Sequence, residues 1–321
     1  MRADEGASTG AAAGRIADAA AERAGSERWT YLAIAAVGAA FWALPVALSS
    51  SIQLDDAELV TIVQGWRLSY DTSQPPLYGW IHQAVSSVLG VSMASTQFVR
   101  LALLVLLFAA VYRLGRRITV HAASQYVLLA GYVFFPIISW EGTHYQTHTV
   151  LLNLMTVALF LIVVEIRKAP DTGKFLLLGA ICGLGLLSKY TFVAILGSVF
   201  VATLSVREYR AALLRPAAAL SFLVMLMIAV PPTLATVWGL GEVSDFPNVT
   251  QEVTNPNVDF ASRSLTGAVK LAEQYATQSL LFVAMVALVW GSAARRIDFR
   301  KAGRNPDFRF FAVQAVTAFL I

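Results

Sequence analysis

Apolar segments recur along the chain, and most approach the roughly 20 residues that an α-helix needs to cross a bilayer. Only 14% of the residues are charged, against about 25% in soluble domains, so an ordinary water-soluble fold is excluded. The sequence therefore predicts an all-α polytopic membrane protein. The predicted segments are Trp29–Ser50, Thr96–Tyr112, Val120–Trp140, Thr149–Ile166, Phe175–Leu187, Phe192–Val206, Pro216–Trp238, Thr277–Ser292 and a ninth that begins near Phe308.

The distribution of basic residues predicts the orientation, because Lys and Arg concentrate on the cytoplasmic side of a membrane. With the N-terminus inside, 19 of the 24 basic residues fall in the N-terminal tail and in four loops on that side. The external segments are then 51–95, 140–149, 188–190 and 239–278. We expect a multi-pass protein of the plasma membrane (the inner membrane in bacteria). The net charge of +4 reflects this topology and does not indicate a nucleic-acid partner.

The domain organisation predicted from composition is simple. Residues 1–28 are rich in Ala, Gly, Ser and charged residues and are predicted to form a disordered cytoplasmic tail. Residues 29–321 form one membrane domain, which we expect to be C-terminally incomplete because the chain ends inside an apolar run. The single cysteine, Cys182, leaves no internal disulfide and no thiolate metal site.

The first external segment carries three acidic residues, Asp55, Asp56 and Glu58, directly after the first apolar segment. Apolar residues then recur at helical spacing up to Tyr70, which predicts an amphipathic helix lying in the interface. Two prolines follow, and a second interfacial helix is predicted over Leu77–Val88. Helix capping explains one or two acids at this position but gives no reason for three, and a catalytic carboxylate is the alternative.

The second external segment contains Glu141, His144 and His148 at positions i, i+3 and i+7. On one continuous helix these side chains would share a face, and an acid with two imidazoles there resembles a divalent-metal site. A polar helix end without metal is the more frequent explanation of such a pattern. A second catalytic or substrate-binding acid at Glu141 is a further alternative.

The third external segment is the short turn Ser188-Lys189-Tyr190. A lysine at this level either extends to the lipid headgroups or contacts a lipid phosphate as part of a site. Before this turn, Gly179 and Gly183 form a small-xxx-small pattern, which predicts close helix packing.

Nucleotide-binding glycine loops and a nucleophile elbow are absent from the sequence. A transporter or flippase of lipid-linked glycans is one alternative, although charged residues at mid-membrane, typical of ion-coupled carriers, are nearly missing. A non-catalytic membrane scaffold is another, and it would not need clustered external acids.

Several motifs occur in an order that resembles glycosyltransferase family 39. An acid pair after the first membrane helix is followed by an amphipathic helix and then by Pro75-Pro-Leu77 with Trp80. Gly115-Arg-Arg117 and the run from Gly183 to Tyr190 come later. This family lies in the C-type superfamily, with the protein mannosyltransferases and ArnT-like lipid A aminoarabinose transferases. The Gln-Pro-Pro-Leu-Tyr variant is most similar to the Rgt-type transferases of lipopolysaccharide cores.

The resemblance implies a C-type transmembrane bundle with interfacial helices in the first external loop. It also implies roles for residues: Asp55 matches the family's catalytic acid, Asp56 its acidic neighbour, and Lys189 a position associated with the phosphate of the lipid carrier. Where many relatives have a basic residue before the two prolines, this chain has Ser73-Gln74. Phosphate contacts would then fall to Arg67 or Lys189, with Gln74, Glu141 and Tyr190 as further substrate-binding candidates.

The chemistry of an external transferase agrees with this set of residues. Nucleotide sugars are not supplied outside the cytoplasm, so the donor would be a polyprenyl-phosphate-linked sugar and the acceptor a lipid A, glycan or protein. Phosphate leaves without a general acid, so one base and one cation suffice. A single attack at the anomeric carbon would invert its configuration. No cofactor is required, with a divalent metal as the alternative.

Overall fold

A computed structural model describes residues 3–48, 54–62, 64–70, 74–119, 121–144, 146–238, 269, 273 and 303–320, with the backbone alone at 3–24, 45, 54–55, 58, 62, 136–137, 140 and 319–320. All regular structure in these residues is helical, which confirms the all-α prediction. The helices with assigned bounds are α1 (Ala3–Leu48), α2 (Leu54–Ile62), α3 (Leu77–Leu89), α4 (Met93–Ile118), α5 (Ala122–Val133), α6 (Pro136–His144), α7 (His148–Lys168), α8 (Thr172–Leu186), α9 (Phe192–Ser205), α10 (Arg207–Leu213), α11 (Ala218–Val237) and α15 (Pro306–Leu320).

Four of these helices are long and apolar enough to cross a membrane: the part of α1 from Gly25 to Leu48, and α4, α7 and α11. Helices α9 and α10 pass the same test together but are bent by 110° at their junction. Helix α8 is apolar and shorter, with 15 residues. The structure is therefore that of a multi-pass membrane protein, as predicted. The predicted span Thr277–Ser292 lies outside the described residues.

The predicted span Val120–Trp140 is wrong as a single helix. It is divided into α5, which ends at Val133, and α6, which begins at Pro136. Proline has no N–H to continue the hydrogen-bond ladder, and it disfavours helical geometry at the preceding residue. Pro136 therefore begins a new helix. Pro231 and Pro232 in α11 do not break that helix, where the hydroxyls of Thr233 and Thr236 donate to the carbonyls four residues earlier.

Two N-terminal segments differ from the prediction. Helix α1 includes residues 3–28, predicted to be disordered; this stretch is alanine-rich, and alanine is the strongest helix former. Helix α2 ends at Ile62 instead of continuing to Tyr70. Gly65 interrupts the apolar pattern three residues later, and glycine is a common helix terminator. The second interfacial helix, α3, agrees with its predicted range to within one residue.

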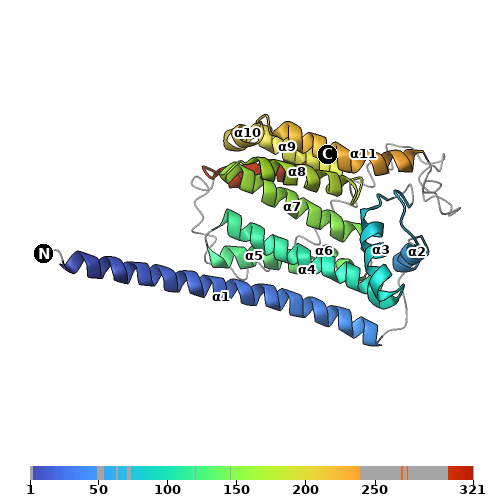
Figure 1. The fold of residues 1–321 in the computed structure, drawn as a ribbon, viewed down its shortest axis with the longest axis horizontal. Coiled ribbons are helices and arrows are strands. Elements are labelled where there is room, and N and C mark those ends of the chain that lie inside the picture. The colour runs from blue at the N-terminus through green and yellow to red at the C-terminus, as the bar shows by residue number, and fades with distance from the viewer. Residues whose placement is uncertain are drawn as a thin grey trace.

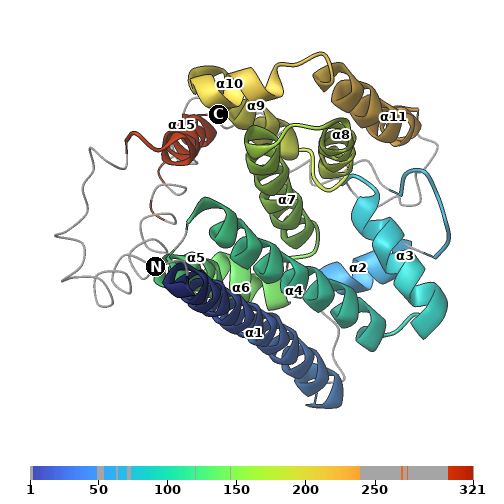
Figure 2. The ribbon, with the colours of Figure 1, turned by 60° about the vertical axis from the view of Figure 1, so that its left-hand side comes forward.

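Helix α4 lies at the centre of the bundle, where it packs against α1, α5 and α7. The core includes Leu107 and Val111 of α4 and Val157 and Val164 of α7, none of them exposed. Helices α7, α8, α9 and α11 form the other side of the bundle (Figures 1 and 2). The interfacial helices α2 and α3 lie at one end of it (Figure 1).

The small-xxx-small pattern of α8 packs closely against α11, as predicted. A Cβ atom added at Gly179 would lie 2.3 Å from the carbonyl oxygen of Ser221, and one added at Gly183 would lie 2.8 Å from the Cβ of Ile228. Both distances are too short for any side chain. Glycine is therefore required at these two positions for the backbones of α8 and α11 to approach each other.

Contacts at the two ends of the bundle agree with the predicted division of the loops. At one end Asp307 pairs with Arg167 and accepts a hydrogen bond from the Tyr209 hydroxyl, while Glu208 pairs with Arg309. All these residues belong to predicted cytoplasmic segments. The predicted external segments meet one another at the opposite end, where Lys189 donates to Thr149.

Candidate functional site

The candidate site lies at the end of the bundle where the first three predicted external segments meet. Helices α2 and α3 come from the first segment, the break between α6 and α7 from the second, and the turn between α8 and α9 from the third. The backbone of Leu77 at the start of α3 donates to the carbonyl of Leu187, 3.0 Å away, just before the α8–α9 turn. This bond fixes α3 against the turn that carries Lys189.

Asp56 and Arg100 form a fully buried ion pair. Asp56 lies on α2 and Arg100 in the second turn of α4, so the pair joins the interfacial helix to the centre of the bundle. A helix of nine residues is marginal in isolation. The pair is therefore a main contact that holds α2 in position, and Asp56 is not accessible to a substrate in this state.

The side chain of Arg100 also caps the C-terminal end of helix α6. Its guanidinium donates to the carbonyls of His144, at 2.9 Å, and Thr143, at 3.3 Å. The last carbonyls of a helix have no partner within it, and a buried polar group without a partner is costly. One arginine thus connects α2, α4 and the end of α6.

Asp55 precedes Asp56 on α2, and the structure describes only its backbone. The side chain of Glu58 is likewise outside the described residues.

Tyr78 and His148 continue the site from Arg100 toward Lys189. The two rings are 5.1 Å apart, and Tyr78 is fully buried. Burial raises the pKa of the Tyr78 hydroxyl, an effect partly offset by the nearby charge of Arg100. The Nδ1 atom of His148 lies 3.3 Å from the carbonyl of Ser188. A carbonyl only accepts, so Nδ1 carries the proton of this bond.

Lys189 donates from Nζ to the hydroxyl of Thr149 at 2.9 Å. Partial burial lowers the pKa of its amine below the ordinary lysine value. The side chain of Lys189 is therefore partly desolvated and lies against Thr149 of α7 rather than extending into solvent. Tyr190, the next residue, is 45% exposed.

Glu141, His144 and His148 are not on one helix, because α6 ends at His144 and α7 begins at His148. Glu141 accepts a hydrogen bond from Gln146 at 2.9 Å, and His144 shares one with Thr143 at 2.8 Å. Within the described part of the chain, no group of three or more His, Cys, Asp or Glu residues is arranged to hold a metal ion. The metal hypothesis therefore gains no support from this structure.

The two remaining candidates lie in the loop before α3. Arg67 is exposed, and its carbonyl accepts a 2.7 Å hydrogen bond from the indole of Trp80. Gln74 is half-buried and directly precedes the buried Pro75 and Pro76. Neither is connected to Lys189 by a hydrogen bond or ion pair among the described residues.

Sequence reasoning did not single out Arg100, Tyr78 or Thr149. A charged residue inside an apolar segment is the one signal that identifies Arg100, because such a residue faces the protein interior and has a partner. Tyr78 and Thr149 carry no comparable signal. Their roles depend on contacts with residues 70 and 40 positions away, respectively.

The fold defines a class: a multi-pass helical membrane protein that resembles the C-type glycosyltransferases. In the structure of ArnT from Cupriavidus metallidurans bound to undecaprenyl phosphate, a similar fold covers 90% of this chain and 58% of that one, with a TM-score of 0.56 and 17% identity. The chain belongs to the family described as dolichyl-phosphate-mannose-protein mannosyltransferase, whose model matches residues 73–235. Membership in a glycosyltransferase family confirms the resemblance seen in the sequence.

Two curated relatives come from Rhizobium johnstonii. The lipopolysaccharide core galacturonosyltransferase RgtA is 29% identical over 264 residues, which is 81% of this chain and 50% of that protein. The lipopolysaccharide core galacturonosyltransferase RgtB is 25% identical over 270 residues, which is 83% of this chain and 54% of that protein. The chain thus spans about half the length of the curated relatives it matches.

Proposed function

We propose that this protein transfers a sugar from a polyprenyl-phosphate-linked donor to an acceptor at the external (periplasmic) face of the bacterial inner membrane, with inversion. The acceptor is a lipid, glycan or protein. The main supporting observation is that the Asp55-Asp56 pair of α2 and Lys189 lie at the same end of the bundle. A series of contacts connects the acid pair to the turn that carries Lys189, and it passes through Asp56, Arg100, Tyr78, His148 and Ser188.

The two acids have different roles in this proposal. Asp56 is buried against Arg100 and acts as a positioning residue that fixes α2. Asp55 is the general base that takes the proton of the acceptor hydroxyl. The oxygen of that hydroxyl then attacks the anomeric carbon, and the bond from this carbon to the phosphate oxygen breaks. The bonding electrons leave with the phosphate, so no general acid is needed.

Lys189 holds the phosphate of the donor. Its ammonium is already fixed on the hydroxyl of Thr149, so a phosphate at this position meets both donor groups with little loss of side-chain entropy. Positioned donors are most effective where charge develops during the reaction. The positive charge of Lys189 therefore stabilises both the bound donor and the departing phosphate.

The names of the relatives indicate which substrates to test first. RgtA and RgtB are named lipopolysaccharide core galacturonosyltransferases, and the ArnT of similar fold was crystallised with undecaprenyl phosphate. These names support a polyprenyl-phosphate-galacturonic acid donor and a lipopolysaccharide core acceptor. A different sugar on the same carrier would leave the proposed roles of Asp55 and Lys189 unchanged.

The test is a reconstitution of the purified protein in proteoliposomes with labelled polyprenyl-phosphate-galacturonic acid and a lipopolysaccharide core acceptor. We expect label to appear in the acceptor with the anomeric configuration opposite to that of the donor. Protease accessibility would establish which face of the vesicle carries the first loop. Movement of labelled donor across the bilayer without transfer would support the flippase alternative instead, and retention of configuration would exclude a single displacement.

A further inference from the structure

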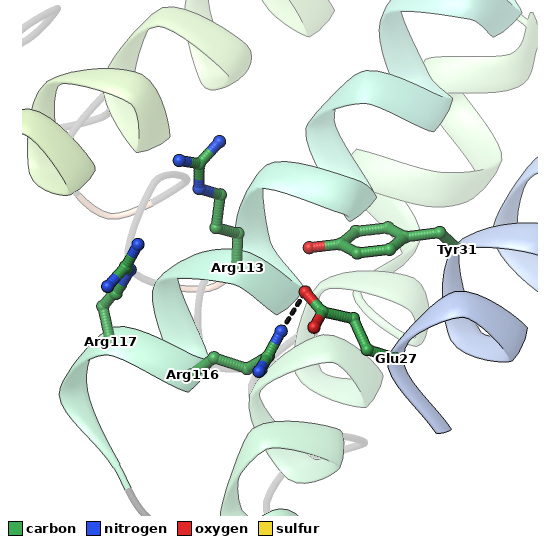
Figure 3. Close-up of a pocket in the computed structure, with 5 residues that line it drawn as sticks. All are labelled: Glu27, Tyr31, Arg113, Arg116 and Arg117. Atoms are coloured by element: carbon green, nitrogen blue, oxygen red, sulfur yellow. Dashed lines mark ion pairs between the residues drawn. The ribbon is translucent and has the colours of Figure 1, made fainter. Parts of the chain in front are cut away.

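A polar cavity lies at the other end of the bundle, between α1 and α4. Its volume is about 490 Å³, and Glu27, Tyr31, Arg113, Arg116 and Arg117 line it. Figure 3 shows the three arginines extending from α4, with Glu27 and Tyr31 extending from α1 toward them. A cavity of this size is within the usual range for small-molecule sites, about 300–1,000 Å³. The proposed glycosyl transfer does not use any of these residues.

The charges around this cavity are predominantly positive. Arg116 pairs with Glu27, and Arg117 pairs with Glu165 at 2.7 Å. Lys168 from α7 donates to the carbonyl of Arg117. Among the described residues, Arg113 has no ion pair and no side-chain hydrogen bond, and it is exposed. Four cations and two carboxylates leave an excess of two positive charges.

Several contacts hold the walls of the cavity in place. The ring of Tyr31 packs edge-on against that of Tyr112, at 5.4 Å between centroids, and Tyr112 stacks on Tyr126 at 5.8 Å. The Tyr126 hydroxyl lies 3.1 Å from that of Thr30 on α1. These contacts fix the start of the membrane-spanning part of α1 beside the end of α4. The cavity is therefore formed by the fold and does not depend on the Glu27–Arg116 pair alone.

The position and charge indicate the chemistry of a ligand. Guanidinium groups bind phosphate oxygens with two parallel hydrogen bonds. Basic pockets between membrane helices on the cytoplasmic side are suited to anionic lipid headgroups. The cavity lies in the predicted cytoplasmic end and is open between two helices of the bundle. We propose that it binds a phosphate group, carried by an anionic lipid of the facing leaflet or by a free anion, with Arg113 as its principal contact.

The experiment measures the affinity of the purified protein, in zwitterionic micelles, for a fluorescent phosphatidylglycerol. Phosphatidylcholine serves as the lipid control and inorganic phosphate as the competitor. Arg113→Gln removes one cation from the cavity, and we expect about fivefold weaker binding, since one basic residue near a membrane contributes about that factor. Arg215→Gln is the matched control, because Arg215 is exposed at the same end but does not line the cavity.

Glu27→Gln gives a change of the opposite sign. Removing this carboxylate releases Arg116 and removes repulsion of the anion, so binding should become tighter by a similar factor. Both affected side chains of that pair are about one-third exposed, so the fold should be maintained. Competition by inorganic phosphate would identify a free anion as the ligand, and its failure to compete would identify the lipid headgroup.

Three results would overturn the proposal. The first is an equal loss of binding in Arg113→Gln and Arg215→Gln, which would indicate diffuse attraction to the whole basic surface. The second is weaker binding in Glu27→Gln. The third is equal affinity for phosphatidylglycerol and phosphatidylcholine with no binding of inorganic phosphate. Because these readouts measure binding only, they are independent of the proposed transfer activity.

Discussion

Replacing Asp56 by asparagine should release α2 from the bundle while the remaining fold is preserved. The substitution keeps the shape of the side chain but leaves the charge of Arg100 buried without its counter-ion. Removing one partner of a buried ion pair costs about 3–5 kcal/mol. Among the described side chains of α2, only that of Asp56 is buried. The lost ion pair therefore mainly weakens the packing of α2 against the bundle.

Local opening is the expected consequence, because α2 has only nine residues and depends on tertiary contacts. A change of about 3–5 kcal/mol corresponds to an increase of about 10²–10³-fold or more in the opening equilibrium. Hydrogen–deuterium exchange of the peptide covering residues 54–62 measures this directly. Residues of α4 and α7 should keep their protection.

Thr61→Val is the matched control on the same helix. Thr61 is exposed, and its hydroxyl donates only to the carbonyl of Ala57 within α2. Its substitution should change exchange by a factor of a few at most. The double variant Asp56→Asn/Arg100→Gln should restore part of the protection, since no buried charge remains. Exchange in Asp56→Asn within a factor of a few of wild type would refute the view that this pair holds α2.

Three further predictions concern other parts of the molecule. Gly179→Ala should destabilise the protein by about 1–3 kcal/mol through overpacking, which would lower its Tm in detergent. Gly25→Ala is the control and should leave the Tm unchanged, because a Cβ atom at Gly25 meets no atom within 4 Å. Equal Tm values for the two variants would contradict the close α8–α11 contact. The lowered pKa of Lys189 means that its ammonium loses its proton below the ordinary pKa of 10.5. Donor affinity should therefore fall as pH rises toward that value. In Lys189→Arg, which stays charged, donor affinity should not fall over this range. Identical pH profiles of donor affinity for the two proteins would exclude Lys189 as the phosphate contact. Burial lowers the pKa of His82 in the folded state below the ordinary value of 6.5. The contribution of His82 to the free energy of unfolding is thus complete above pH 6.5 and is lost as pH falls through the folded-state pKa, by at most about 1.4 kcal/mol per pH unit. If His82→Gln left the pH dependence of the free energy of unfolding unchanged, this view would be contradicted.

Apolar length and basic-residue distribution were sufficient to predict the main helices and the grouping of the loops. The ends of α7 and α11 were predicted to within two residues, because their apolar runs are bounded by charged or polar residues, whereas α4 continues to Ile118, beyond its predicted end at Tyr112. The sequence was misleading where local chemistry competes with the apolar pattern. Pro136 divides one expected span, and α2 ends before Gly65. The alanine-rich residues 3–28 are helical despite a composition typical of disorder.

The site was predictable only in part, for a physical reason. Asp55, Asp56 and Lys189 became candidates because polar residues at a membrane boundary are conspicuous in an apolar chain. The burial of Asp56 was not predictable, since it depends on Arg100, 44 residues away. The environment of Asp56 is therefore a property of the tertiary structure.

The most direct test of the proposed mechanism is the transfer rate of Asp55→Asn in proteoliposomes, measured together with its donor affinity. Asparagine is nearly isosteric, so the donor should bind with unchanged affinity and α2 should keep its protection from exchange. Loss of a general base should lower the transfer rate by about 10²–10⁴-fold. A rate within a factor of a few of wild type would contradict the assignment of Asp55 as the base and leave helix capping as the better explanation of that residue.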